Sequence, residues 1–249
     1  MGLGGNPAAR PAYDRGVREN GFGQPIGAPV ADWGGAQPIS PVTLTGTHVR
    51  LEPLTDAHAE VLYDPLVTES DPRDWTYLFG EPGMDRGQFA AYVGRLQRTP
   101  ASLPMAILSA GGAGVGIAAY LRIDPAMGSA EVGSILYAAA LQRTTGATEA
   151  MALMARHVFD DLGYRRYEWK CDSLNAPSRA AATRLGFRYE GRFRNAVVYK
   201  GRNRDTDWFA MTDGDWPGVK AAYAAWLDPE NFDPDGAQRR SLAELLGHF

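Results

Sequence analysis

The segment that most constrains the fold is residues 141–156, with the sequence LQRTTGATEAMALMAR. It follows a strand-like run at residues 131–137, EVGSILY, and its Ala- and Met-rich second half predicts a helix. The start of a helix leaves several backbone N–H groups unpaired and carries a partial positive charge. Such a start can bind a diphosphate where a glycine, here Gly146, lets the backbone approach the ligand. Taken alone, the segment is equally compatible with an ordinary turn between a strand and a helix.

A second informative segment lies further along the chain. Residues 167–171, YEWKC, predict a short strand, because aromatic residues favour pleated positions. Asn175 then predicts the start of a helix with Pro177 in its first turn, and Gly186 suits the position just after that helix. On this local interpretation Asn175 is a cap and Ser178 is a first-turn residue, and neither needs a further role.

Taken together, the two segments resemble the acyl-CoA-dependent N-acyltransferases of the GNAT superfamily, and within it most closely the RimJ/RimL-like branch. The motifs of that branch occur here in the same order, and the resemblance covers residues 42–216. They stand as Glu131-Val132-Gly133, Arg143-Thr-Thr-Gly146-Ala-Thr148, Asn175-Ala-Pro-Ser178 and Leu185-Gly186-Phe187-Arg-Tyr-Glu190-Gly191. Two positions depart from the pattern. Thr148 replaces the usual glycine or alanine, and Val197 stands where some relatives carry an acidic residue.

The resemblance implies an α/β fold of the GNAT type, with a mixed, mostly antiparallel central sheet of about seven strands flanked by helices. The fourth and fifth strands would be parallel, joined by a crossover helix, and splayed apart. The pantetheine arm of CoA would then enter between them and pair with backbone groups like an added strand. The resemblance assigns the following residues to CoA: Ser134, Ile135, Leu136, Arg143, Thr144, Thr145, Gly146, Ala147, Thr148, Asn175 and Ser178.

The activity implied by the resemblance is direct transfer of an acetyl group from acetyl-CoA to a primary amine in a ternary complex. Positioning supplies much of the rate, the amine must be neutral to attack, and the oxyanion needs a donor such as the N–H near Leu136. Ser178 matches the acid that the family is proposed to use for the departing thiolate, and Tyr137 is a second candidate. Glu131 is the candidate for a base or an amine-orienting residue. Its alternative role is that of an edge charge without catalytic function.

The acceptor is expected beside the aromatic segment with Trp75, Tyr77 and Phe79 and beside the charged hairpin with Arg194 and Arg202. The hairpin cations could hold a substrate carboxylate, or they could form a solvated tip. We expect a small-molecule amine, with a protein N-terminus as the alternative acceptor. A non-catalytic acyl-CoA-binding module and transfer of a longer acyl group, such as succinyl, remain open.

Several simple patterns predict the organisation of the chain. Residues 1–41 are rich in Gly and Pro and predict an extended arm without regular structure, before an acyltransferase domain at 42–216 and a helical extension at 217–249. Thr55 is expected to cap the first helix of that domain. The glycine cluster at residues 111–114 lies between two predicted strands and is not followed by a helix, so it predicts a hairpin turn and not a dinucleotide site.

Composition narrows the function classes. A net charge of −4 argues against a broad nucleic-acid-binding surface. The only cysteine, Cys171, excludes an intrachain disulfide and fits a reducing compartment. No apolar run approaches the roughly 20 residues that span a bilayer, and the first residues lack the pattern of a signal peptide. We therefore expect a cytoplasmic protein that uses no metal, and a homodimer is left open.

Overall fold

The computed structural model describes residues 18–247 of the chain. The chain divides into two compact units, Met1–Gly34 and Gly35–Phe249. Residues 35–41, expected in the N-terminal arm, belong to the second unit. Ala36 N–H donates to the carbonyl of Pro125 at 2.8 Å, and the Ile39 side chain packs against the main core. The boundary between the two units, after Gly34, therefore falls seven residues before the predicted end of the arm at residue 41.

The described part of the first unit is a short hairpin. Strand β1 (Arg18–Glu19) pairs antiparallel with β2 (Pro25–Ile26). The Asn20 side-chain oxygen accepts hydrogen bonds from the N–H groups of Phe22 at 2.9 Å and Gln24 at 3.0 Å. An asparagine side chain can close a turn in this way because it imitates a backbone acceptor. Regular structure is thus present where we expected none, and residues 1–17 lie outside the described part.

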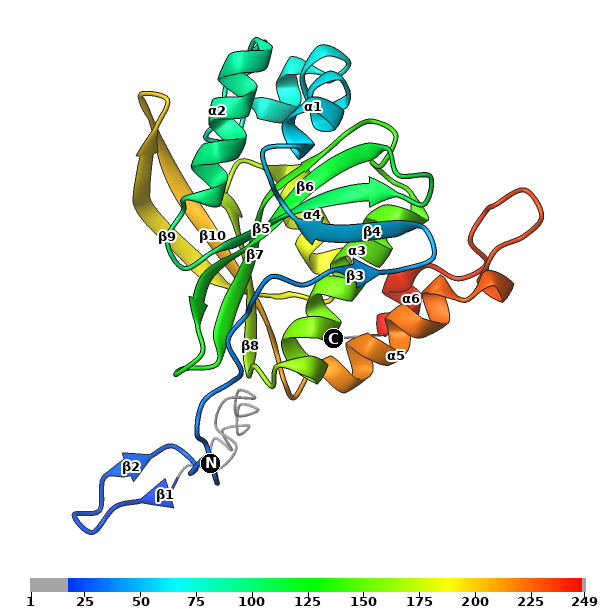
Figure 1. Ribbon diagram of the computed structural model, residues 1–249. Coiled ribbons are helices and arrows are strands. Elements are labelled where there is room, and N and C mark those ends of the chain that lie inside the picture. The colour runs from blue at the N-terminus through cyan, green and yellow to red at the C-terminus, as the bar shows by residue number, and fades with distance from the viewer. Residues whose placement is uncertain (1–17, 248–249) are drawn as a thin grey trace, which may run out of the picture. The chain divides into compact units, whose positions relative to one another are not determined.

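The second unit is built on one eight-stranded sheet (Figure 1). The strands lie in the order β3 (Leu44–Thr45), β4 (Val49–Pro53), β5 (Leu103–Ser109), β6 (Gly114–Asp124), β7 (Ser129–Tyr137), β8 (Arg166–Asp172), β10 (Arg202–Thr212) and β9 (Arg188–Tyr199). All neighbours are antiparallel except β7 and β8. This is the mixed, mostly antiparallel sheet that the resemblance implied, with one strand more than expected.

The extra strand arises at residues 42–54, whose alternation of apolar and polar residues predicts one strand but which form two, β3 and β4. The buried Glu149 carboxylate accepts hydrogen bonds from the N–H groups of Thr47 at 2.8 Å, His48 at 2.7 Å and Val49 at 3.0 Å. Those backbone groups are satisfied by a side chain on a helix and make a tight turn there. A single carboxylate therefore divides one sequence pattern into two strands.

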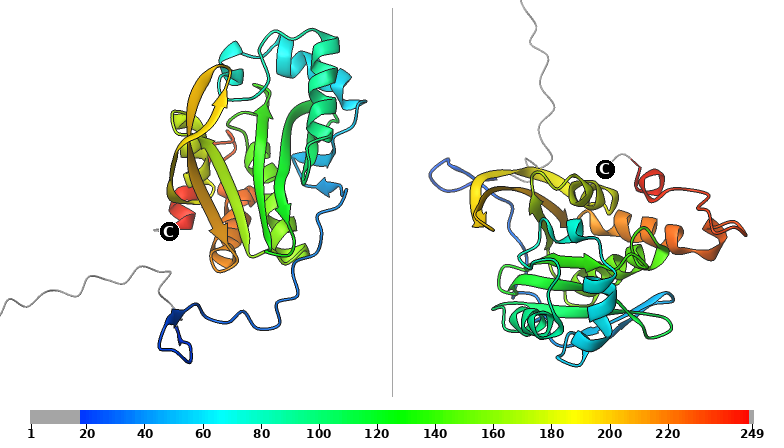
Figure 2. Two further views of the ribbon diagram at one scale, coloured as in Figure 1. Left: turned by 90° about the vertical axis from the view of Figure 1, so that its left-hand side faces the viewer. Right: turned by 90° about the horizontal axis from the view of Figure 1, so that it is seen from above.

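Helices cover both faces of the sheet (Figures 1 and 2). They are α1 (His58–Tyr63), α2 (Arg86–Gln97), α3 (Thr145–Arg156), α4 (Ala176–Arg184), α5 (Trp216–Leu227) and α6 (Leu242–Leu246). Residues of α1 and α2, such as Leu62 and Phe89, share one core cluster with Ile117 of the sheet. Residues of α3 and α5, such as Met154, pack in the other cluster with Val132. No helix within residues 18–247 has the length and apolar character to cross a bilayer.

Two local expectations have different outcomes. The turn at residues 111–114 joins β5 and β6 as a hairpin, with Gly112 at a φ of +85°, so that prediction is confirmed. Thr55 does not cap α1, because Ala57 occupies the N-cap position. Instead the Thr55 N–H lies 2.9 Å from His58 Nδ1, whose other ring nitrogen is 2.9 Å from Glu52. The His58 side chain therefore links the first turn of α1 to the residues that precede it.

Candidate active site

Strands β7 and β8 separate partway along their length. Their parallel pairing runs from Ser129 and Arg166 to Val132 and Trp169 and includes no later residue. Beyond that point β7 continues on β6, and β8 continues on β10. The register between β6 and β7 also shifts here, and Ser134 has a left-handed φ of +50°. A bulge of this kind bends a strand, and here it accompanies the divergence of β7 from β8.

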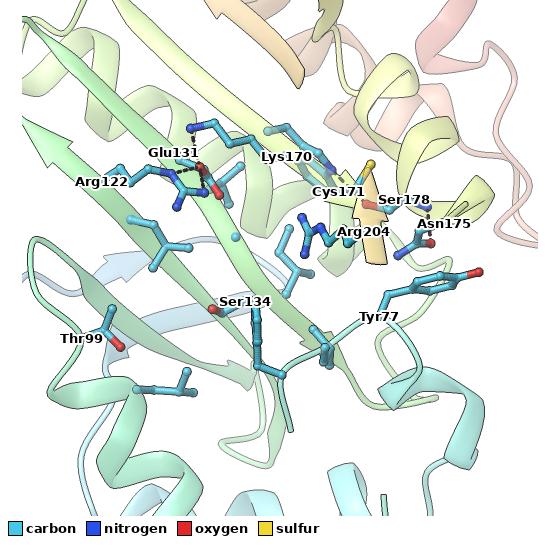
Figure 3. A pocket seen from close by; sticks show the side chains of 18 of the residues that line it. Tyr77, Thr99, Arg122, Glu131, Ser134, Lys170, Cys171, Asn175, Ser178 and Arg204 are labelled. Atoms are coloured by element: carbon cyan, nitrogen blue, oxygen red, sulfur yellow. Dashed lines mark hydrogen bonds and ion pairs between the residues drawn. The ribbon is translucent and has the colours of Figure 1, made fainter. Parts of the chain in front are cut away.

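A cavity of about 660 Å³ opens at this divergence (Figure 3). Strand β7 contributes Glu131, Ser134 and Ile135 to its wall, and β8 contributes Trp169, Lys170 and Cys171. Further lining residues come from the start of α4, from α2 and the residues that follow it, from the segment around Tyr77, and from Arg204 on β10. Sheet, helices and hairpin thus meet around one space.

Two residues at the start of α4 face this cavity. Asn175 is the N-cap, and its Oδ1 accepts a hydrogen bond from the Ser178 N–H at 3.1 Å. Its Nδ2 has no partner among the described residues, so one half of the amide caps the helix and the other half is available to a ligand. Ser178 Oγ accepts a hydrogen bond from Trp169 Nε1 at 3.0 Å. The capping role and the binding role of Asn175 are therefore compatible.

Cys171 lies beside Ser178 in the same wall. Burial raises the pKa of the Cys171 thiol, and the Ser178 hydrogen bond opposes that change only in part. A thiol with a raised pKa is a poor nucleophile near neutral pH. This environment argues for direct transfer and against a cysteine-linked intermediate.

The predicted phosphate turn lies at the start of α3 but outside this cavity. Thr144 is the N-cap; its Oγ1 accepts from Ala147 N–H at 3.2 Å and donates to the Leu141 carbonyl at 2.7 Å. Arg143 precedes it, exposed, with a φ of +60°. Among the described residues the N–H groups of Thr145 and Gly146 have no partner. They are the free groups of a helix start, which favour an anion.

Two residues of this turn have surroundings different from those expected. A Cβ at Gly146 would lie 3.0 Å from Val49 Cγ1 and 3.5 Å from His48 Cβ. The missing side chain therefore lets the helix start pack on β4. Thr148 is buried, and its hydroxyl accepts from Arg184 Nη1 at 3.1 Å. The Thr148 side chain thus bonds to α4, and its role as a CoA contact has no support from its side chain.

Glu131 lines the cavity as an ion-paired carboxylate. Its side chain is only 3 % exposed, and Oε2 lies 2.6 Å from Arg122 Nε and 3.0 Å from Lys170 Nζ. Lys170, only 4 % exposed, also lies 2.7 Å from Glu168. Figure 3 shows Arg122 and Lys170 meeting at this carboxylate. Because two cations hold this carboxylate in place, the geometry favours a role for Glu131 in orienting an amine.

Lys170 was not identified as a site residue from the sequence, although the strand pattern pointed to it. Alternation along the predicted strand places Lys170 on the same face as Glu168. The parallel register pairs Glu168 with Glu131, and this puts the lysine within reach of both carboxylates. That register could not be read from the sequence.

The structure places Tyr137 away from the cavity. Its hydroxyl is buried without a hydrogen-bond partner among the described residues, and burial raises its pKa. Tyr137 is also absent from the cavity wall. An acid role for Tyr137 finds no support in this geometry, and Ser178 is the better placed of the two candidates.

The expected acceptor residues separate into two groups. Tyr77 and Phe79 line the cavity, and the Tyr77 hydroxyl donates to the Leu174 carbonyl at 3.1 Å. Trp75 does not line it, because its ring is fully buried and packs edge-on against Tyr92 at 5.5 Å between ring centroids. Trp75 is therefore a core residue and not part of the acceptor wall.

The charged hairpin is packed against the protein. Lys200 Nζ donates to the Trp75 carbonyl at 2.8 Å, and Arg202 donates to the Thr76 carbonyl at 3.1 Å. Arg194 is exposed on β9, and neither Arg194 nor Arg202 lines the cavity. The arginine of this hairpin that does line it is Arg204. Arg194 and Arg202 thus lie outside the cavity wall, and this geometry gives neither of them a contact with an acceptor bound there.

Comparison with known proteins agrees with this architecture. Residues 48–188 match the acetyltransferase (GNAT) domain family, and they make up more than half of the chain. A solved GCN5-related N-acetyltransferase from Brucella melitensis is 42% identical with a TM-score of 0.84, covering 87% of this chain and 99% of that one. The chain belongs to the GNAT acetyltransferase family, whose domains use acetyl-CoA.

Two further solved structures extend the comparison. A probable GNAT-family acetyltransferase from Chromobacterium violaceum is 35% identical with a TM-score of 0.73, covering 78% of this chain and 98% of that one. An acetyltransferase from Salmonella typhimurium, which modifies the N-terminal serine of ribosomal protein L7/L12, shares the fold at 19% identity and a TM-score of 0.60. That match covers 69% of this chain and 99% of that one. No curated protein matches the chain.

Proposed function

We propose that this protein is an N-acetyltransferase that moves the acetyl group of acetyl-CoA directly to the primary amine of a small molecule. The observation that carries the proposal is the end of β7–β8 pairing at Val132 and Trp169, with a cavity at the divergence that Asn175 and Ser178 face. Beyond Val132, the edge of β7 toward β8 has no strand partner in the described sheet. That edge and the free Asn175 amide suit the peptide-like arm of CoA.

Different groups of the protein suit different parts of acetyl-CoA. The unpaired N–H groups of Thr145 and Gly146, with the nearby Arg143, suit the diphosphate. Backbone groups of residues 134–136 suit the amides of the pantetheine arm, and an N–H near Leu136 suits the developing oxyanion. Acetyl-CoA supplies the activated thioester, so the protein's main contribution is to position the two reactants.

The reaction balances without a covalent enzyme intermediate. The ammonium group first loses a proton to water, and the lone pair of the neutral amine then forms the C–N bond to the thioester carbon. This gives a tetrahedral oxyanion with a positively charged nitrogen; the nitrogen loses its second proton to water, and collapse of the oxyanion breaks the C–S bond. The leaving thiolate takes a proton from the Ser178 hydroxyl, which recovers one from solvent. Glu131 orients the incoming amine, because Arg122 and Lys170 hold its carboxylate in place.

The alternative acceptor is a protein N-terminus, as for the RimJ/RimL-like branch. Its support is the distant structural likeness to the Salmonella typhimurium enzyme. We favour a small molecule because the β9–β10 hairpin packs onto the segment around Trp75 through Lys200 and Arg202. Those contacts limit the space for an extended polypeptide. A non-catalytic acyl-CoA-binding module is disfavoured by the available Asn175 amide and by Ser178 in the cavity wall.

The test is release of free thiol from acetyl-CoA over a panel of small amines and peptides with ribosomal N-termini. Turnover that depends on a small amine supports the proposal, and turnover on the peptides alone supports the alternative. Thiol release at the same rate without any amine indicates hydrolysis and contradicts transfer. Binding of acetyl-CoA with no turnover on either panel would favour the binding module.

A further inference from the structure

The charges that line the cavity do not balance. Four cationic side chains, Arg95, Arg122, Lys170 and Arg204, line it together with one carboxylate, Glu131. Glu131 is already held by Arg122 and Lys170. Within residues 18–247, neither Arg95 nor Arg204 makes an ion pair with a carboxylate. The cavity therefore presents two uncompensated guanidinium groups to whatever occupies it.

Arg204 is the better placed of these two cations. Figure 3 shows its side chain pointing into the cavity from β10. Its Nε donates to Thr206 Oγ1 at 3.1 Å, which fixes the plane of the group. Its two terminal nitrogens have no hydrogen-bond partner among the described residues, and the guanidinium carbon lies 5.9 Å from the centroid of the Tyr199 ring. A guanidinium edge that is held in place and left free in this way matches a carboxylate through two parallel hydrogen bonds.

The carboxylates nearest to Arg204 along the chain and across the sheet are bound elsewhere. Asp205 accepts from the Asn195 N–H at 2.8 Å and from Asn203 Nδ2 at 3.1 Å, where β9 bulges. Asp172 accepts from the Tyr199 hydroxyl at 2.8 Å.

Asp207 is equally committed, because it lies between Arg192 at 2.6 Å and Arg179 at 2.8 Å. None of these three acidic side chains forms an ion pair with Arg204. The positive charge of Arg204 is thus left unbalanced because the nearby carboxylates bind other groups.

The phosphates of CoA do not account for this charge. The helix start that suits the diphosphate, residues 143–148, contributes no side chain to the cavity wall. Arg204 lines the cavity from β10, and Tyr77, Phe79 and Arg95 line it as well. Arg204 thus shares the cavity with Tyr77 and Phe79, two of the residues expected beside the acceptor.

We propose that the acceptor is a small amine that carries a carboxylate, which Arg204 binds through both terminal nitrogens and the positive charge of Arg95 also attracts. This inference rests on the proposed acetyltransferase function and names its substrate class. The amine of such a molecule would point toward Glu131, so that one end is held by a cation and the other by the carboxylate.

The experiment uses matched substrate pairs: glycine, β-alanine and γ-aminobutyrate, each with its primary amide. Each compound is measured with the wild-type protein, Arg204→Gln and Arg204→Lys. Each variant is compared with the wild type on the same compound, so that differences in amine basicity between compounds do not affect the comparison. Because hydrogen bonds to charged groups are strong, Arg204→Gln should raise KM for the preferred carboxylate roughly tenfold to a hundredfold. KM for its amide and for acetyl-CoA should stay within about twofold, and Arg204→Lys should recover part of the loss.

Arg156→Gln is the matched control, because Arg156 is exposed at the end of α3 and outside the cavity. It should leave both members of each pair unchanged. Equal loss on acids and amides in Arg204→Gln, or no preference for acids in the wild-type protein, would overturn the inference.

Calorimetric binding of the same compounds separates this inference from the proposed function. Carboxylate binding that Arg204→Gln abolishes, in a protein that acetylates nothing, would refute only the proposed function. Equal binding of acids and amides would refute the acceptor class.

Discussion

Replacing Lys170 with Met gives a sharp test of the buried charges beside the site. The Lys170 ammonium lies 3.0 Å from Glu131 and 2.7 Å from Glu168, and its side chain is only 4 % exposed. Met keeps most of the side-chain volume but leaves the two carboxylates facing each other without the cation between them. Breaking a buried ion pair by removing one partner costs about 3–5 kcal/mol.

The lower end of that range is expected here. Glu131 keeps Arg122 as a partner, and Glu168 keeps Arg166 at 2.6 Å. We therefore expect a loss of about 3 kcal/mol, which corresponds to roughly 6–12 °C in Tm for a domain of this size. Urea unfolding followed by tryptophan fluorescence would measure the free energy directly.

The pH dependence provides a second readout. Burial opposes ionisation of Glu168, but hydrogen bonds from Lys170 and Arg166 outweigh it and hold the pKa below 4.5. A lowered carboxyl pKa gives stability that is present above the unfolded-state value and is lost as the pH falls through the folded-state value. The gap between wild type and Lys170→Met should accordingly shrink as the pH drops below about 4.5.

Lys220→Met is the matched control. Lys220 pairs with Asp160 at 2.8 Å, but its side chain is 55 % exposed. Exposed pairs contribute about 0–1 kcal/mol, so this variant should stay close to wild type. A cost for Lys170→Met below about 1 kcal/mol, or a gap that does not change with pH, would refute the reasoning.

Three further predictions concern the acyl-donor site. Asn175→Asp should keep the α4 cap and thermal stability but lose the Nδ2 donor, raising the Kd for acetyl-CoA roughly tenfold, whereas Asn175→Ala should also lose about 1 kcal/mol of stability. Calorimetry and thermal unfolding separate the two effects, and unchanged affinity in both variants would exclude the amide as a contact. Ser178→Ala should lower kcat more than it raises KM for acetyl-CoA, and wild-type turnover would remove the acid role. Gly146→Ala should cost about 1–3 kcal/mol by crowding Val49 and His48. A Gly146→Ala protein that unfolds at the wild-type urea concentration would show that the contact with β4 is not tight.

Features that depend on neighbouring residues were predictable from the sequence. Asn175 and Ser178 begin a helix because a cap bonds to a backbone N–H three residues away, a short-range relation that the order of residues reveals. The strand before α3 and the strand after it were recognisable by residue type. The parallel pair and the crossover, which the resemblance implied, are consistent with a helix lying between these two strands in the chain.

Features that depend on which side a residue faces were less predictable. Trp75 and Tyr77 belong to one aromatic segment, yet the first is a core residue and the second lines the cavity. Gly146 was expected to let a ligand approach the backbone, and the structure shows that its missing side chain also gives room to β4. The sequence pattern shows that a position needs a small residue without showing which neighbour requires it.

What the sequence by itself determined is most of the elements between residues 42 and 216 and their order, including the helix start after Arg143 and the cap at Asn175. These follow from hydrogen bonds and periodicities that reach only a few residues. Tertiary structure alone decided that Lys170 joins Glu131 and that Arg204, not Arg202, enters the cavity. The first depends on the parallel register of β7 and β8, which α3 separates in the chain. The second depends on position along β10, because Arg202 and Arg204 lie on the same face of that strand and only Arg204 lies at the level of the cavity.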